Sequence, residues 1–347
     1  MKTTVAFCLV AVACGTSEPA LTDATSLTCP TPGALPFRLM SSGFHSADNK
    51  TLAMVDTRFK DEASDTLGVP SGVQANDYLA DTASPAAGAI GYHGVKARTT
   101  SGEGGTSSPL PGENVSLWFY DGSGSDDGAW EQLARGQTGD DGSYDLTADP
   151  DVTPPNGAPV YSMLEADGTC SEHQAYLLPT GSKFVVVDID GTLTTSDGEL
   201  IKQVTDGSYV PMMMTAANAM TQAWATKGYP VVYLTARPHV FDEDTRVWLA
   251  TQGFADGPLI LENEGAGSAD VYKTRWLQRM ATDFGWVPFA AYGNAITDIE
   301  AYANVSIALD HTFIIGPEGG SGGTVAIPNM DYTQHITDFV DMQPDNH

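Results

Sequence analysis

Basic residues are scarce in this chain. Only 16 lysines and arginines stand against 44 aspartates and glutamates, which gives a formal net charge of −28. A surface of this sign repels polyanions, so the composition argues against nucleic acid as a partner. No run of 18 or more apolar residues follows the amino terminus, so no membrane-spanning helix is expected. What remains is an acidic, globular chain whose 347 residues favour two domains.

The amino terminus is typical of an export signal. Lys2 precedes an apolar run from Val5 to Ala13. Two processing patterns compete at its end. Ala11-Val12-Ala13 fits an ordinary signal peptidase, whereas Ala13-Cys14-Gly15 resembles a bacterial lipobox in which the cysteine becomes a lipidated first residue.

The low cysteine count bears on this choice. The chain has four cysteines, and Cys8 is lost with a signal segment of residues 1–13. Simple cleavage leaves three cysteines, whereas lipidation of Cys14 leaves Cys29 and Cys170 as a pair able to form a disulfide. The even count favours an exported protein anchored by lipid to a bacterial membrane, with residues 14–28 as a tether. The alternative is a secreted or periplasmic protein without the anchor.

Short strands and turns dominate residues 29–180. The clearest strand patterns cover 115–120, 130–134, 159–164 and 174–178, and glycine, serine and aspartate separate them. Strands at this spacing predict a small β-sandwich-like domain that resembles Ig-like modules.

From Lys183 the pattern changes to strands that alternate with helices. Continuous apolar strands such as Phe184–Val187 are typical of a parallel sheet buried on both faces. The expected strands are 184–187, 231–234, 259–261, 289–292, 306–309 and 313–315, and the expected helices are 211–227, 241–252 and 270–284. This alternation predicts a doubly wound α/β domain over residues 181–320. Residues 321–347 are expected to form a carboxy-terminal tail.

Polar side chains gather where these strands end. The first strand runs into Asp188-Ile189-Asp190-Gly191-Thr192, the second into Thr235-Ala236-Arg237, and the fourth into Gly293-Asn294-Ala295-Ile296-Thr297-Asp298. Lys273 lies in the helix after the third strand. Reactive groups of a doubly wound sheet lie at these carboxyl ends. The set resembles the four motifs of the haloacid-dehalogenase superfamily of phosphotransferases.

The resemblance implies a role for each residue. Asp188 is expected to attack phosphorus and form an aspartyl-phosphate, and Asp190 to protonate the leaving alkoxide and then to activate water. The expected phosphate-binding residues are Gly191, Thr192, Thr235, Ala236 and Lys273, of which Thr235 and Lys273 are also counted as catalytic. The expected Mg²⁺ ligands are Asp188, the backbone carbonyl of Asp190, Asn294 and Asp298.

A narrower resemblance covers roughly residues 183–320. The segments DIDGTLT, YLTARP, DGPLILEN, YKTRWLQ and FAAYGNAITDIEAYANVSI are similar to the lipin family and to the related LNS2 domains of membrane-associated phosphatidylinositol-transfer proteins. Lipins are phosphatidate phosphatases, whereas LNS2 domains of the transfer proteins look like lipid-binding relatives whose catalytic acids have degraded. Both Asp188 and Asp190 are present here, which favours an enzyme. Ala295 stands where lipin-like sequences often carry a basic residue.

Cap domains select small substrates in this superfamily. Only about 40 positions separate Thr192 from Thr235, and Thr235 from Lys273, too few for an inserted domain of roughly 50 or more residues. A capless, open site suits a large substrate. The sequence therefore predicts a Mg²⁺-dependent phosphatase that acts on a phosphatidate-like lipid. Two alternatives remain: a phospholipid-binding LNS2 module without turnover, and a phosphatase for soluble or protein phosphates.

Overall fold

The computed structural model describes residues 72–73, 77–81, 93–98, 107–109, 114–121, 129–139, 143–146, 152–164, 170–205, 209–238, 241–262 and 268–346. The expected signal segment, the tether with Cys14, and Cys29 of the expected disulfide lie outside these residues. Among the described residues, no helix combines the length and the apolar character needed to cross a bilayer.

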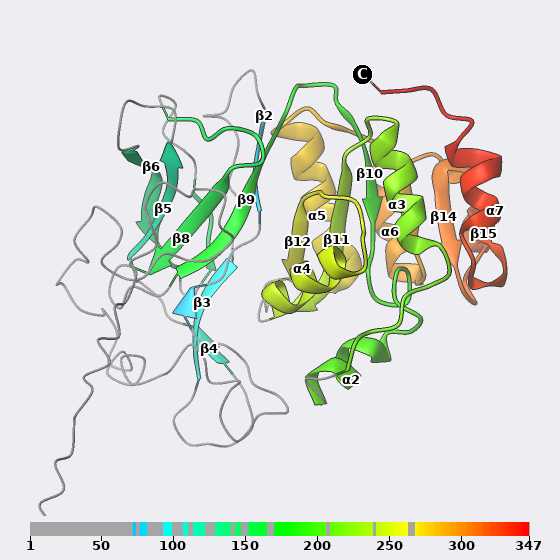
Figure 1. The fold of residues 1–347 in the computed structure, drawn as a ribbon, viewed down its shortest axis with the longest axis horizontal. Coiled ribbons are helices and arrows are strands. Elements are labelled where there is room, and N and C mark those ends of the chain that lie inside the picture. The colour runs from blue at the N-terminus through cyan, green and yellow to red at the C-terminus, as the bar shows by residue number, and fades with distance from the viewer. Residues whose placement is uncertain are drawn as a thin grey trace, which may run out of the picture.

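Six parallel strands form the sheet of the carboxy-terminal half, in the order β12-β11-β10-β13-β14-β15 (Figure 1). They are β10 (Lys183–Val187), β11 (Val231–Pro238), β12 (Leu259–Glu262), β13 (Val287–Gly293), β14 (Thr312–Ile315) and β15 (Val325–Ile327). The chain moves outward from β10 on one side and outward from β13 on the other. The winding direction therefore reverses between β10 and β13, which is where doubly wound sheets bind ligands.

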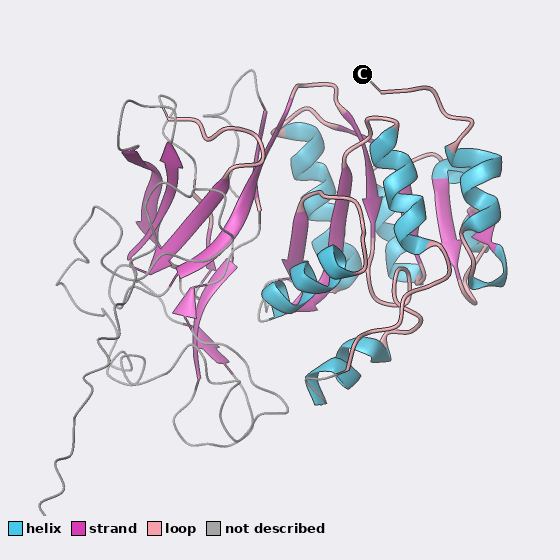
Figure 2. Ribbon diagram, in the orientation of Figure 1, coloured by secondary structure: helices cyan, strands magenta, loops and turns pink. Residues whose placement is uncertain are grey.

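Helices cover both faces of this sheet (Figure 2). They are α3 (Ala217–Thr226), α4 (Asp242–Thr251), α5 (Ala269–Thr282), α6 (Ile296–Asn304) and α7 (Thr333–His335). The helix α2 (Gly198–Thr205) lies away from the sheet, below it in the view of Figure 1. Val185 and Val187 pack in one core with residues of α3 and α4, while Phe184 and Val186 pack in a second core with α5 and α6. Two covered faces explain why the strand is apolar throughout, so the predicted α/β class is confirmed.

One expected strand is absent and one expected helix begins later than predicted, and left-handed backbone conformations explain both differences. The residues expected as a strand at 306–309 begin with Ser306 at φ 60° and continue into a 3-10 turn, Leu309–His311. An extended strand cannot accommodate that φ. The helix expected from residue 211 begins at Ala217, because Ala216 has a φ of 59°.

The segment expected as a tail belongs to the domain. β15 pairs with β14, and the buried Tyr332 donates its hydroxyl hydrogen to the carbonyl oxygen of Thr192 at 3.1 Å. In the turns between β14 and β15, Gly316, Gly320 and Gly322 all have positive φ. They form defined turns that favour glycine.

The amino-terminal half contains two further sheets. The larger has the order β2-β9-β8-β5-β6, and the smaller joins β1, β3 and β4, with β7 paired to β3. The strands are β1 (Gly72–Val73), β2 (Tyr78–Asp81), β3 (His93–Arg98), β4 (Ser107–Pro109), β5 (Asn114–Asp121), β6 (Ala129–Gln137), β7 (Ser143–Tyr144), β8 (Pro159–Leu164) and β9 (Cys170–Leu178). The four strands expected from the sequence in this half correspond to β5, β6, β8 and β9.

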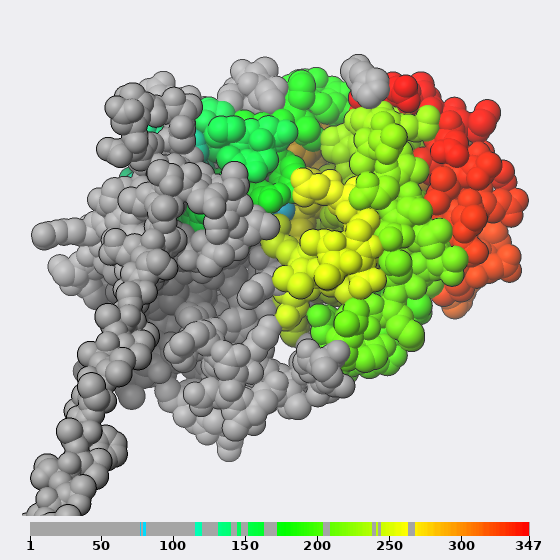
Figure 3. Space-filling model, viewed as in Figure 1, coloured from blue at the N-terminus to red at the C-terminus, as the bar shows by residue number. Residues whose placement is uncertain are grey.

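The fully buried carboxylate of Asp77 joins the two halves. It accepts hydrogen bonds from the backbone nitrogens of Gln174, in β9, and Leu259, in β12, each at 2.7 Å. It also pairs with Arg246 of α4 at 3.0 Å. In the space-filling view α4 (yellow) lies beside the described part of the amino-terminal half (Figure 3). One carboxylate thus ties two strands of different sheets to a helix.

Candidate active site

Asp188 occupies the point where the winding of the sheet reverses. It follows β10 directly, and its backbone nitrogen donates to the carbonyl oxygen of Tyr292 in β13. Its carboxylate is buried. One oxygen accepts from Nζ of Lys273 at 2.6 Å, and the other accepts from the hydroxyl of Thr192 at 3.0 Å. The ends of β10 and α5 thus bring the expected nucleophile and the expected charge-compensating lysine into direct contact.

Lys273 is shared by two carboxylates. Its Nζ also lies 2.6 Å from Oδ1 of Asp298, and all three side chains are buried. Burial raises the pKa of Asp188, Lys273 opposes that shift and Asp298 adds to it, so the pKa of Asp188 rises to about 7. Burial alone would lower the pKa of Lys273, but the two carboxylates raise it above its ordinary value. Two carboxylates against one ammonium leave a net negative charge that a cation would offset.

Asn294 adds an amide oxygen beside Asp188. The hydroxyl of Thr192 lies within hydrogen-bond distance of both Oδ2 of Asp188 and Oδ1 of Asn294, at 3.0 and 3.3 Å. The two oxygens therefore converge on one point. Carboxylate and amide oxygens are the ligands that Mg²⁺ accepts, so this pair fits the ion. Among the described residues, no group of three or more His, Cys, Asp and Glu side chains is placed to hold a metal.

Asp298 contacts both Lys273 and the backbone of the loop after β13. Its Oδ2 accepts from the backbone nitrogens of Asn294 and Ala295, each at 3.0 Å, while Oδ1 faces Lys273. Asp298 lies in the first turn of α6, where a carboxylate is favoured by the exposed N–H groups and the helix dipole. It therefore fixes both Lys273 and the loop that carries Asn294.

Gly191 allows the loop after β10 to approach Asn294. Its φ is 71°, and a Cβ atom on it would lie 2.1 Å from Nδ2 of Asn294 and 2.5 Å from Oδ1 of Asp197. Its backbone nitrogen donates to the hydroxyl of Thr194 at 3.0 Å. Only glycine meets both the conformation and the space.

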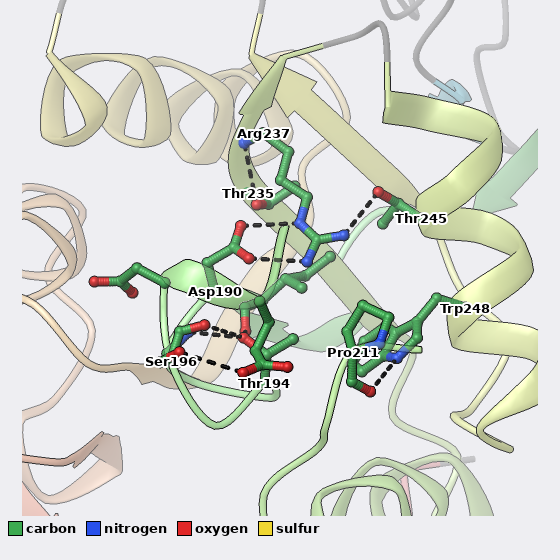
Figure 4. Close-up of polar contacts among 12 residues, drawn as sticks. Asp190, Thr194, Ser196, Pro211, Thr235, Arg237, Thr245 and Trp248 are labelled. Carbon is green, nitrogen blue, oxygen red and sulfur yellow. Dashed lines mark hydrogen bonds and ion pairs between the residues drawn. The ribbon is translucent and has the colours of Figure 1, made fainter. Parts of the chain in front are cut away.

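Asp190 is held by an arginine from the neighbouring strand. Nε and one Nη of Arg237 donate to its two oxygens at 2.9 and 2.8 Å, and the other Nη donates to Thr245 of α4 at 3.0 Å (Figure 4). The Arg237 side chain is fully buried, whereas Asp190 keeps 21% of its side chain exposed. Asp190 is thus oriented from one side and open on the other.

The remaining sequence-predicted residues lie on β11. Thr235 is buried, and its hydroxyl accepts from the backbone nitrogen of Arg237 at 3.2 Å. Ala236, between them, is exposed. The sequence interpretation gave Arg237 no role, although it stands in the YLTARP segment. The available signal was an arginine two positions after a strand-end threonine, beside the other polar residues at the strand ends; its partner became visible only in the structure.

Comparison with known proteins fits this geometry. Residues 185–316 match the family described as "PITM 1-3, LNS2 domain". This stretch of the chain is similar to LNS2 domains. LNS2 domains are haloacid-dehalogenase-like, in agreement with the parallel sheet and the strand-end acids.

Curated relatives share this region. Drosophila melanogaster "Protein retinal degeneration B" is 28% identical over 194 residues, which cover 55% of this chain and 15% of that protein. Mus musculus "Membrane-associated phosphatidylinositol transfer protein 2" is 25% identical over 158 residues, or 46% of this chain and 11% of that protein. The chain thus matches only a small part of the length of these relatives. A chain from the "Structure of the Pnkp1/Rnl/Hen1 RNA repair complex" is 17% identical with a TM-score of 0.31, covers 38% of this chain and 42% of that one, and carries no argument.

Proposed function

We propose that the LNS2 domain of this chain is a Mg²⁺-dependent phosphatase that hydrolyses a phosphomonoester, a phosphatidate-like lipid, through a phosphorylated Asp188. The contact of buried Asp188 with Lys273 at 2.6 Å carries the proposal. A carboxylate in that position can attack phosphorus, and the lysine can offset the charge of the incoming phosphoryl group.

The proposed reaction has two steps, phosphorylation of Asp188 and hydrolysis of the phosphorylated residue. An oxygen of Asp188 forms a bond to phosphorus while the bond to the lipid oxygen breaks, and Asp190 gives that oxygen a proton. Asp190 then takes a proton from water, whose oxygen bonds to phosphorus as the bond to Asp188 breaks. Asp188, the backbone carbonyl of Asp190 and Asn294 would hold Mg²⁺, with Asp298 supporting them. The ion would offset the repulsion between carboxylate and phosphate.

The substrate follows from an open site. Between Thr194 and Met213, which face each other in an isolated β-bridge, α2 is the only regular element described. We infer that the domain has no cap and that its site admits a large headgroup. The two amino-terminal sheets would form the sandwich-like domain, and a lipid on Cys14 would hold the exported chain at a bacterial bilayer.

The test is phosphate release from phosphatidate in mixed micelles by a chain that begins after Cys14. We expect release with Mg²⁺, none after chelation, and none from Asp188→Asn. Release that persists in Asp188→Asn would overturn the proposed nucleophile. Equal release from a soluble sugar phosphate at matched concentration would overturn the lipid assignment.

A second function has its own support. One of the relatives above is named as a phosphatidylinositol transfer protein, and both oxygens of Asp190 are engaged by Arg237. A lipid-binding module without turnover would bind the same micelles saturably, with or without Mg²⁺, and would release no phosphate.

A further inference from the structure

The orientation of Asp190 depends on Arg237 and on the helix that holds this arginine. Arg237 uses two nitrogens on the two carboxylate oxygens, a paired geometry that fixes the plane of the carboxylate as well as its position. The Asp190 side chain keeps 21% of its surface exposed although both of its oxygens are engaged. A carboxylate held in this way stays accessible in a fixed orientation.

Arg237 is itself held by α4. Its third donor binds the hydroxyl of Thr245, and its Cζ lies 6.0 Å from the ring centre of Trp248. Thr245 and Trp248 are three positions apart and so share one face of the helix. The indole nitrogen of Trp248 donates to the carbonyl oxygen of Pro211 at 3.0 Å, which fixes the ring in turn. The guanidinium therefore has little freedom while α4 stays in place.

The amino-terminal half reaches the same helix. Arg246, next to Thr245, pairs with the buried Asp77, which also binds the backbone of β9 and β12. Asp77 thus contacts α4 at Arg246, and the adjacent Thr245 contacts Arg237, which pairs with Asp190. The two sets of contacts are joined by the backbone of α4. The contact between Arg279 of α5 and Asp145, at 2.7 Å, also joins the two halves but touches neither α4 nor Arg237.

We propose that Arg237 is a positioning residue for Asp190, and that the amino-terminal half contributes to this positioning by fixing α4 through Asp77 and Arg246. The proposal rests on the phosphatase function above. It assigns the β half a part in proton transfer to the leaving group, with no contact of its own to the substrate.

Two substrates with different leaving groups can distinguish a role of Arg237 in positioning Asp190 from a general role in stability. An alkoxide needs a proton as it departs, whereas p-nitrophenolate departs readily without one. We expect Arg237→Gln to lower kcat for phosphatidate by about tenfold or more, and kcat for p-nitrophenyl phosphate by less than about threefold, because only the first reaction depends on a well-placed acid. In an Asp190→Asn background the same substitution should change the ratio of the two rates no further.

Milder variants keep the test decisive if Arg237→Gln folds poorly. Thr245→Val and Asp77→Asn should also lower the ratio of kcat for phosphatidate to kcat for p-nitrophenyl phosphate, by smaller factors than Arg237→Gln. Thr245→Val should have the larger effect of the two. Arg279→Gln is the matched control, because it removes a contact between the halves that does not involve α4 and should leave the ratio unchanged. Equal losses on both substrates in Arg237→Gln and Thr245→Val would overturn the positioning role alone. A wild-type chain that releases phosphate from neither substrate would overturn the phosphatase proposal, and the positioning role with it.

Discussion

Lys273 of the carboxy-terminal half lies 2.6 Å from each of two carboxylates, whereas in the described part of the amino-terminal half neither oxygen of Glu172 accepts a hydrogen bond. Nδ1 of the buried His173, beside it, also lacks a partner in that region. Burial raises the pKa of Glu172 to about 8 and lowers the pKa of His173 to about 3. The cluster around Lys273 is therefore held by ion pairs, whereas Glu172 and His173 favour their neutral forms.

The difference distinguishes buried groups that are kept charged by a partner from buried groups that are neutral. A charged group inside a protein is stable only with a partner, and such pairs are retained where their charge serves chemistry or positioning. Neutral forms are adequate where the groups only pack. The contrast predicts a loss of stability when charge is removed from a paired group and a gain when it is removed from Glu172, which lacks a hydrogen-bond partner among the described residues.

The largest effect is expected at Lys273. Lys273→Met leaves Asp188 and Asp298 buried without a cation, which should lower the free energy of unfolding by about 3–5 kcal/mol. Denaturant titration measures this. Lys183→Met, at an exposed lysine of β10, is the control and should change stability little. A loss below about 1 kcal/mol in Lys273→Met would mean that the buried cluster is not a stabilising ion pair.

The contact between the halves should come next. Asp77→Asn removes the charge that faces Arg246 and weakens the hydrogen bonds from Gln174 and Leu259, at an expected cost of about 1.5–3 kcal/mol. Asp145→Asn removes the partly exposed ion pair with Arg279, which also joins the two halves. It should lower the free energy of unfolding by less than about 1 kcal/mol. Equal costs would show that burial of Asp77 adds nothing.

The smallest effect should have the opposite sign. The folded pKa of Glu172 lies above its ordinary 4.5, so its contribution to stability is complete below about 4.5 and is lost as the pH rises toward about 8. Glu172→Gln removes the ionisable group and with it this loss of stability at high pH. We expect a rise in the unfolding midpoint of about 2–4 °C at pH 8 and no change at pH 4.5, with the effect reduced because the side chain is partly exposed. The exposed Glu300→Gln is the control, and a fall at pH 8 would contradict the comparison.

The sequence predicts the regular part of this architecture because local patterns determine it. The apolar strands at 184–187, 231–234 and 259–261 are confirmed, and the position of the acids at strand ends follows from strand direction alone. The pairing of Arg237 with Asp190 could not be predicted, because it depends on the register of β10 beside β11 and on Thr245 from α4. The place of Tyr332 under the Thr192 carbonyl depends on how the chain returns after β15, which no local pattern encodes.

The most direct test of the account is to trap the phosphorylated carboxylate. Asp190→Asn should slow the step in which water attacks, while p-nitrophenyl phosphate still allows the first step because its leaving group needs no acid. Borohydride reduction after a brief reaction would convert a phosphorylated aspartate to homoserine, which mass spectrometry of the peptide locates. The account predicts homoserine at position 188 when Mg²⁺ is present. Phosphate release with Asp188 unmodified, or a label on another residue, would contradict it.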